Sequence, residues 1–268
     1  MKYFSILLFV ALFTISTNIL GGAYQSSYKA LLEIKEKTLL IPDMNYSNET
    51  KTLFNNMFSF QKEIKFVKQE VIDSLLSIHH DGYAALTTFT MTSEVDIAVF
   101  LAYRNLESKN EFDKNSGAVS LFFNIEDLND DEDEFSEASF LLSSRVLSSQ
   151  IKLALKEKKG YDWKTYSKFT QKTSLKKSDK LYFFSNHVKE GIDVSNICSS
   201  FFDLNPKGDD FANFMQKEDN IIVSSYVFPY LYLVNAKTGE ILYQEKRLDV
   251  QSYSFNLKLL NKIKSKLE

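Results

Sequence analysis

The chain has 268 residues, of which 44% are hydrophobic and 14% aromatic, and it carries a formal net charge of −3. This composition is typical of a folded globular protein, and it argues against a nucleic-acid partner, whose phosphates attract a basic surface. Arginine accounts for only 3 of the 32 basic residues, so bidentate capture of phosphate or carboxylate groups is not expected either.

The N-terminus has the pattern of a secretory signal peptide, residues 1–23. Lys2 precedes an almost unbroken apolar run from 3 to 15, and Gly21 and Ala23 provide the small residues of a cleavage site. We therefore expect cleavage after Ala23 and export to the periplasm or the medium, with no membrane span in the mature chain. The alternative is an uncleaved membrane anchor, because the apolar segment is nearly long enough to cross a bilayer.

Residues 24–125 form the first predicted half, an α/β unit. Stretches with apolar residues at helical spacing alternate there with short apolar runs of strand length. Ser47 is placed to cap a helix and Gly82 to end one. In chain order we expect a helix at 27–37, a strand at 37–42, a helix from Ser47, a strand at 63–67, a further helix, and strands at 83–90, 95–103 and 118–125. The first helix should turn Leu31, Leu32 and Ile34 inward. The second should bury Leu53, Phe54, Met57 and Phe58, and the third Val71, Ile72, Leu75 and Leu76.

Residues 126–160 form an acidic loop and a connecting helix. Acidic residues crowd the segment 126–137, and this acidic run suggests a calcium-binding loop. Such a loop needs a glycine at its sixth position and a glutamate at its twelfth, but Glu132 and Ala138 stand there. A long helical pattern follows and ends in lysines, so the charges at its two ends complement the helix dipole. We interpret the acidic run as a solvated loop and helix start. Weak cation binding and an acidic docking surface are the alternatives.

Residues 161–268 repeat the order of the first half. We expect a strand at 180–186, a helix capped by Asp193, a strand near 201–205, a helix from Asp209 or Asp210, three strands between 221 and 247, and a helix at 254–267. The predicted fold class is α/β, with two similar β-α-β-α-β-β halves joined by the acidic loop and the long helix. An ancient duplication and chance both explain the shared order, because alternating α/β order is common.

Residues that usually carry chemistry are sparse in this sequence. The three histidines are His79, His80 and His187, and neighbours on a helix point about 100° apart, which disfavours a shared metal. The sequence contains no nucleophile elbow and no phosphate-binding glycine motif, so we expect no cofactor. Cys198 is the only cysteine, which rules out an internal disulfide. Its helical apolar spacing predicts a buried side chain, and the alternative is a reactive thiol or an intermolecular bridge.

Four aromatic residues of the second half alternate along the chain and would line one face of a strand. They are our candidate ligand or partner face: Tyr226, Phe228, Tyr230 and Tyr232. In this interpretation they form an aromatic platform for a glycan or a peptide. The alternative is an aromatic sheet face that a helix covers.

The same segment is similar to the end of a thioredoxin fold. Pro229 precedes a strand, Gly239 lies in the turn to a second strand, and the helix at 254–267 closes the domain. The resemblance implies that the C-terminal half is a degenerate thioredoxin-like fold without disulfide chemistry, because Cys198 has no partner cysteine.

These features together favour an exported, non-catalytic α/β protein that binds a protein or small-molecule partner outside the cytoplasm. An inactive thioredoxin-like interaction domain is one alternative. A hydrolase with a site that no motif reveals is the other.

Overall fold

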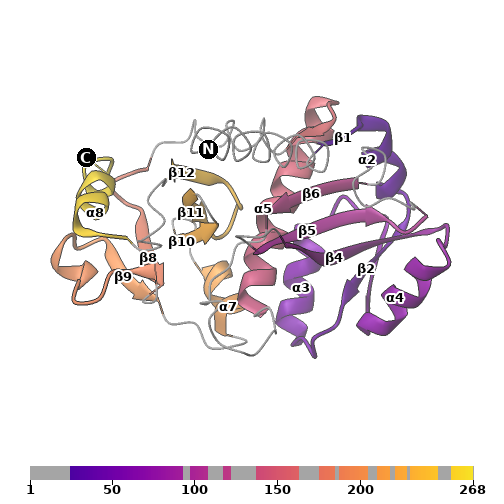
Figure 1. The fold of residues 1–268 in the computed structure, drawn as a ribbon, viewed down its shortest axis with the longest axis horizontal. Coiled ribbons are helices and arrows are strands. Elements are labelled where there is room, and N and C mark those ends of the chain that lie inside the picture. Colours follow the sequence, from indigo (N-terminus) through magenta and orange to yellow (C-terminus); the bar gives the residue numbers. More distant parts are fainter. Residues whose placement is uncertain are drawn as a thin grey trace, which may run out of the picture.

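The computed structural model shows an α/β protein with two five-stranded mixed sheets (Figure 1). It describes residues 25–92, 97–107, 117–121, 137–162, 175–184, 187–204, 210–217, 221–227, 230–246 and 255–267. The predicted signal peptide and the acidic run up to residue 136 lie outside these residues. Within the described part, no helix combines the length and the apolar character that crossing a membrane requires.

The first sheet has the strand order β3-β2-β4-β5-β6. β2 pairs in parallel with β3 on one side and with β4 on the other, and β4, β5 and β6 then follow one another in antiparallel pairs. The strands are β2 (Thr38–Pro42), β3 (Glu63–Val67), β4 (Tyr83–Thr92), β5 (Ile97–Asn105) and β6 (Gly117–Leu121).

The second sheet has the strand order β9-β8-β10-β11-β12, which is the same arrangement. Its first strand in the chain, β8, again pairs in parallel with the next two strands, and the last three strands are antiparallel. The strands are β8 (Lys180–Phe184), β9 (Phe201–Leu204), β10 (Ile221–Val227), β11 (Tyr230–Asn235) and β12 (Ile241–Lys246). The prediction of an α/β fold with two similar halves is therefore confirmed.

Six α-helices and a short 3-10 helix connect and cover these strands in the described part. Side-chain oxygens cap three of the helices, since Ser27, Ser47 and Asn256 each accept a hydrogen bond from a backbone N–H three residues later. The helices are α2 (Tyr28–Lys35), α3 (Asn48–Met57), α4 (Gln69–Ser77), α5 (Glu137–Glu157), α7 (Asp210–Lys217) and α8 (Leu257–Lys264), with η3 (Val194–Asn196) as the 3-10 turn.

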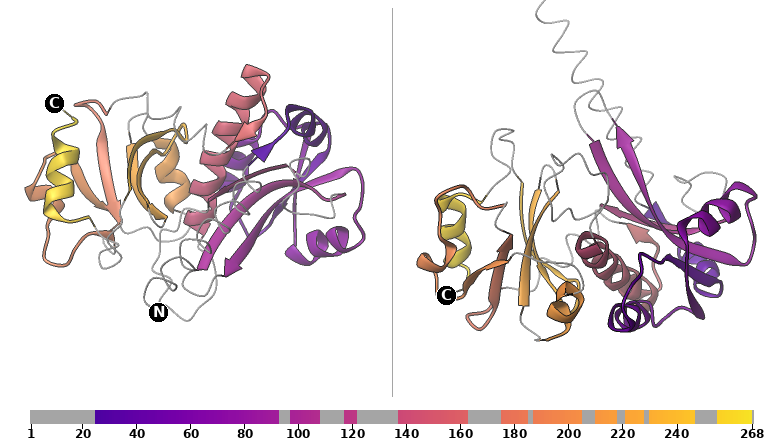
Figure 2. Two further views of the ribbon diagram at one scale, coloured as in Figure 1. Left: turned by 45° about the horizontal axis from the view of Figure 1, so that its top comes forward. Right: turned by 90° about the horizontal axis from the view of Figure 1, so that it is seen from below.

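Helix α5 lies between the two sheets and joins the halves (Figures 1 and 2). Its buried residues belong to one apolar cluster that also contains residues of α2, α3, β4 and β5 from the first half and of α7, β10 and β11 from the second. A small third sheet of β1 (Gln25–Ser26) and β7 (Tyr161–Asp162) ties the chain after α5 back to the start of the described structure. The two halves therefore share one core.

The outer face of each sheet has its own helix and its own smaller apolar cluster. On the first sheet, Ile72 of α4 packs with Leu40 and Ala85. On the second sheet, η3 and α8 cover the outer face, where Val194 and Leu260 contribute to the cluster. From one end to the other, the layers are α4, the first sheet, the central helices around α5, the second sheet, and α8 with η3.

Some predicted details are wrong. The segment after Asp193 forms the single 3-10 turn η3 instead of a longer helix, whereas the strand predicted near 201–205 is present as β9. Helix α4 ends well before Gly82, and His79 adopts a left-handed conformation with φ 50°. Leu32 and Val71, which were predicted to face inward, are exposed.

Candidate functional site

The structure resolves only part of the predicted aromatic face. Tyr232 is 1% exposed and belongs to the central core. Phe228 and the side chains of Tyr226 and Tyr230 lie outside the described residues. Tyr232 is therefore a core residue and is not part of an open platform. For this residue the structure agrees with the alternative interpretation, in which the aromatic face is covered.

The strand register also separates the positions that the sequence pattern placed together. β10 ends at Val227 and β11 begins at Tyr230, and these two residues are paired. The two strands run antiparallel, so that Tyr226 stands opposite Leu231 whereas Tyr232 stands opposite Ser225. Directly opposite positions share a face, and faces alternate along a strand. The positions of Tyr226 and Tyr232 therefore lie on opposite faces of the sheet, which corrects the predicted single face.

A different group of aromatic side chains is partly exposed on the second half, and we call it the aromatic cluster. It consists of Tyr182 on β8, Phe202 on β9 and Phe214 on α7. The rings of Tyr182 and Phe202 stack with centroids 5.1 Å apart, and Phe214 meets Tyr182 edge-on at 4.8 Å. Phe202 is 37% exposed, whereas its neighbour Phe201 is buried. Stacked rings of this kind offer a preformed apolar contact surface.

The strand geometry explains why the aromatic cluster forms. Tyr182 and Phe202 are register partners in the parallel pair of β8 and β9, so their rings meet on the same face. Phe201 points the other way and packs against Phe183 in the outer cluster. The sequence shows that Phe201 and Phe202 are neighbours. Neighbours in a strand point to opposite faces of the sheet, so each of the two faces must hold one of these rings. The sequence does not show that residues from three separate segments meet there.

Strand β9 lies at one end of the second sheet, where a further strand can be added. Among the described residues it pairs with β8 only, and both Phe202 and Asp203 are exposed. An edge strand presents backbone N–H and C=O groups that can pair with an extended chain. The exposed edge and the aromatic cluster therefore adjoin each other on one side of the molecule.

A polar group lies at the carboxyl end of β2, the place where open α/β sheets commonly bind ligands. Lys51 Nζ donates to Asp43 Oδ2 at 2.8 Å, and Thr50 Oγ1 donates to Glu137 Oε1 at 3.3 Å, which links α3 to the start of α5. The hydrogen bond from Lys51 lowers the pKa of the Asp43 carboxyl. Each of these carboxylates thus already accepts a hydrogen bond from α3.

Tyr46 is buried beside this polar group. Its hydroxyl has no hydrogen-bond partner among the residues that the structure describes. Burial, together with the charges of Glu137 and Asp43, raises the pKa of Tyr46 above its ordinary value, which favours the protonated hydroxyl. Its ring packs against Phe54 with centroids 5.2 Å apart, which gives it a core role.

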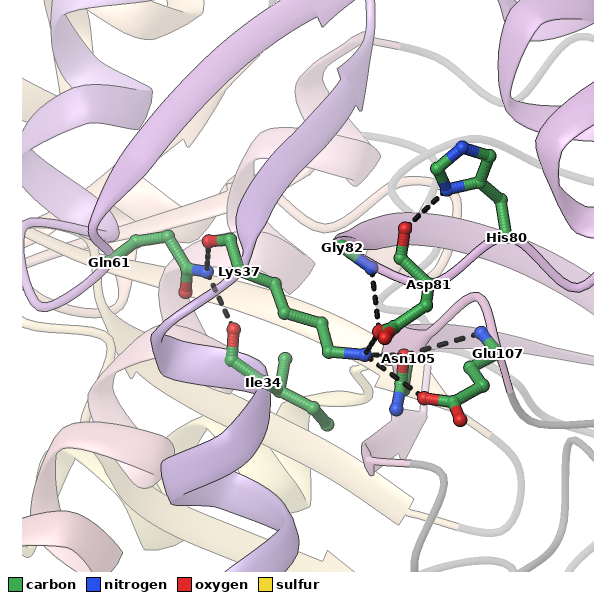
Figure 3. A network of polar contacts seen from close by, with 8 residues as sticks. All are labelled: Ile34, Lys37, Gln61, His80, Asp81, Gly82, Asn105 and Glu107. Atoms are coloured by element: carbon green, nitrogen blue, oxygen red, sulfur yellow. Dashed lines mark hydrogen bonds and ion pairs between the residues drawn. The ribbon is translucent and has the colours of Figure 1, made fainter.

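A second polar network lies at the opposite end of the same sheet (Figure 3). Lys37 Nζ donates to Asp81 Oδ1 at 2.6 Å and to Asn105 Oδ1 at 2.9 Å, and it pairs with Glu107 Oε2 at 3.2 Å. His80 Nδ1 donates to the carbonyl oxygen of Asp81. The network joins the starts of β2 and β4 to the end of β5. Because the bonds of Lys37 connect residues at or next to strand ends around the amino end of β2, we assign the network to stability and not to a ligand site.

The histidines are distributed over both halves. His79 and His80 lie in the turn after α4, and His187 lies in the second half beside Phe184, with ring centroids 5.7 Å apart. Among the residues that the structure describes, no group of three or more His, Cys, Asp or Glu side chains is arranged to hold a metal ion.

Cys198 is partly exposed, in contrast to the predicted buried position. The helix that would have buried it does not form, and the thiol follows η3 at the border of the outer apolar cluster. It remains a single free thiol.

The comparisons with family models, curated proteins and solved structures give no match. The order predicted from the thioredoxin resemblance, strand, turn, strand and helix, is present as β11, β12 and α8. The first half contains the same order as β5, β6 and α5, so this order does not distinguish a thioredoxin-like half. The resemblance stays a prediction.

Proposed function

We propose that this protein is exported and binds a protein partner outside the cytoplasm without catalysing a reaction. The observation that carries the proposal is the aromatic cluster, in which Phe202 is 37% exposed and stacked on Tyr182. Aromatic side chains that are already packed lose little conformational freedom on binding, and they contribute strongly to interfaces. The cluster is therefore suited to contact apolar side chains of a partner.

The exposed edge of β9 supports a polypeptide as the partner. An extended segment can add to a sheet edge, where main-chain hydrogen bonds provide affinity and pockets for alternate side chains provide specificity. Here the aromatic cluster lies on the sheet face next to this edge. A bound strand would direct every second side chain to the face that carries the aromatic cluster, and the side chain nearest to Phe202 would contact its ring. This function takes the place of the predicted platform at Tyr226 to Tyr232.

Export is supported by the sequence alone. Lys2, the apolar run and Ala23 follow the order of a cleaved signal peptide. Intact-mass measurement of the protein from its native host should give a chain that begins near Tyr24. A full-length chain in the cytosol would contradict export.

Affinity capture from the envelope fraction of the native host tests the binding function. The bait proteins are the wild type, Phe202→Thr, and Leu32→Thr as the control. Threonine suits a strand, so the first variant removes the ring and keeps the propensity of β9. Leu32 is an equally exposed apolar residue on α2. We expect the wild type and the Leu32 variant to capture the same protein and the Phe202 variant to lose it.

Thermal melting of the three baits shows whether each is folded. Capture of the same proteins by all three folded baits would contradict binding through the aromatic cluster, and so would the absence of any specific capture by the wild type.

A further inference from the structure

The helices of the two halves correspond as well as the strands do. In the first half, α3 and the closing helix α5 lie on one face of the sheet and α4 lies on the other. In the second half, η3 and the closing helix α8 share one face and α7 lies on the other. Helix α5 thus corresponds to α8, and α4 corresponds to α7.

This correspondence shows how the halves are joined. The α5 face of the first half packs against the α7 face of the second, within one apolar cluster. Two different faces of a repeated unit meet, which makes the contact heterologous, or head-to-tail. The α8 face of the second half is equivalent to the α5 face of the first, and the α4 face of the first half is equivalent to the α7 face of the second. The α4 face and the α8 face lie at opposite ends of the molecule (Figure 1).

Both terminal faces expose apolar side chains. Val71 of α4 is 43% exposed and Ile78, the residue directly after the helix, is 66% exposed, and Leu75 lies between them on the same flank at helical spacing. On α8, Leu257 is 53% exposed. Three of the six large exposed hydrophobic residues in the described part therefore lie on these two helices or directly after one of them, out of Leu32, Met44, Val71, Ile78, Phe202 and Leu257.

The two helices themselves carry opposite charge. Helix α4 has two acidic residues, Glu70 and Asp73, and no basic one. Helix α8 has three lysines, including Lys258 and Lys262, and no acidic residue. Lys262 already pairs with Glu245 of β12 at 2.7 Å, whereas Lys258 is exposed at the start of the helix. Complementary charge of this kind favours one partner over others and fixes its orientation.

We propose that copies of this chain associate head to tail, with the α8 face of one molecule on the α4 face of the next. The contact extends the arrangement that already joins the two halves of each chain. Leu257 meets the Val71 and Ile78 flank, and Lys258 faces the acidic residues of α4. Because the two faces differ, the association does not close at a dimer. This inference is independent of binding at β9.

Sedimentation velocity of the purified protein at low ionic strength, over a range of concentrations, tests the proposal. The variants are Val71→Gln with Ile78→Gln, which alters the α4 face, and Leu257→Gln, which alters the α8 face. Leu32→Gln is the control, since Leu32 lies on neither face. All the substituted side chains are exposed, so the variants should melt as the wild type does.

We expect the average mass of the wild type and of the control to rise with concentration beyond that of a dimer, and to fall when salt is added. Each face variant alone should associate at least about tenfold more weakly. An equal mixture of the two face variants should form one-to-one dimers only, because each supplies the face that the other lacks.

A wild type that stays monomeric at low salt, or that stops at a dimer, would overturn the proposal. Face variants that associate like the wild type would overturn it too. If Leu257→Gln does not fold, Lys258→Glu tests the same face, and it should weaken the association in low salt more than in high salt.

Discussion

Gln61 illustrates how single buried polar residues hold the first half together. Its Nε2 donates to the carbonyl oxygens of Ile34 and Lys37 at 2.8 and 2.6 Å, and its Oε1 accepts from the Tyr103 hydroxyl at 2.6 Å (Figure 3 shows the first two bonds). Burial raises the pKa of Tyr103, which leaves its hydroxyl a permanent donor. One side chain thereby connects the end of α2, the residue before β2 and the last part of β5.

Gln61→Leu should lower the free energy of unfolding by roughly 2–4 kcal/mol, because each buried polar group left without a partner costs about 1–3 kcal/mol. The groups concerned are the Tyr103 hydroxyl and the Lys37 carbonyl. The same replacement at Gln216, which is exposed on α7, should change the free energy by less than about 0.5 kcal/mol. Chemical denaturation measures both. Equal effects at the two positions would show that Gln61 is not a structural link.

The ion pair of Asp43 and Lys51 predicts a dependence of stability on pH. The pKa of Asp43 is lowered from its ordinary value of 3.8, first by the hydrogen bond from Lys51. A carboxyl whose pKa is lower in the folded state stabilises the fold above its ordinary pKa, and this contribution is lost as the pH falls through the folded value. Acidification from about pH 5 to about pH 3 should therefore destabilise the wild type more than Lys51→Met. Identical melting-temperature changes in the two proteins would contradict this.

At the level of helices and strands, the sequence predicted most of the fold. Apolar periodicity located β2, β3 and β8 and the helices α3 and α5, and Ser47 marked a helix start that the structure confirms. Periodicity failed where a contact distant in sequence decides the outcome. The segment after Asp193 has apolar residues at helical spacing but forms only the 3-10 turn η3. The antiparallel register of β10 and β11 puts the positions of Tyr226 and Tyr232 on opposite faces, and alternation along a sequence cannot show that two strands are involved.

The candidate site was less predictable than the fold for the same reason. The aromatic cluster draws one ring from each of β8, β9 and α7, and no spacing in the sequence relates them. The predicted face relied on four residues of one segment, and one of them, Tyr232, fills the core instead. Burial by another element, here the central helices, cannot be read from the alternation itself.

The turn between β11 and β12 touches α5, and one glycine permits the contact. Gly239 has φ 76°, and a Cβ there would overlap the carbonyl oxygen of Arg145 on α5. Gly191 has a similar φ of 80°, but no atom lies within 4 Å of its Cβ position. A comparison of alanine substitutions at the two glycines therefore separates two contributions to the free energy of unfolding: the backbone conformation and the packing between the halves.

Gly191→Ala should lower the free energy of unfolding by about 1–2 kcal/mol, the cost of a left-handed alanine. Gly239→Ala should lower it by about 2–5 kcal/mol, because forced packing against α5 adds about 1–3 kcal/mol. Urea denaturation compares the two. If both variants lose the same stability, the turn does not depend on its contact with α5.

At the level of the whole molecule, two sheets of the same topology share one core around α5, and among the described residues the edge strand β9 of the second sheet pairs with β8 only. The shared core fixes the second sheet from its inner side, through α5 and α7. The aromatic cluster lies next to α7 on that same sheet. A partner at β9 thus meets a surface that is already ordered, which reduces the entropy lost on binding.

Site-specific photo-crosslinking in the native host tests the proposed binding function most directly. A photoreactive residue replaces Asp203, which is exposed on β9 next to Phe202, and in a separate control it replaces Lys29, whose side chain is 87% exposed on α2. We predict a discrete crosslinked adduct with one partner protein from position 203, lost when Phe202→Thr is added, and none from position 29. The same adducts from both positions, or none from position 203, would contradict a partner at the β9 edge.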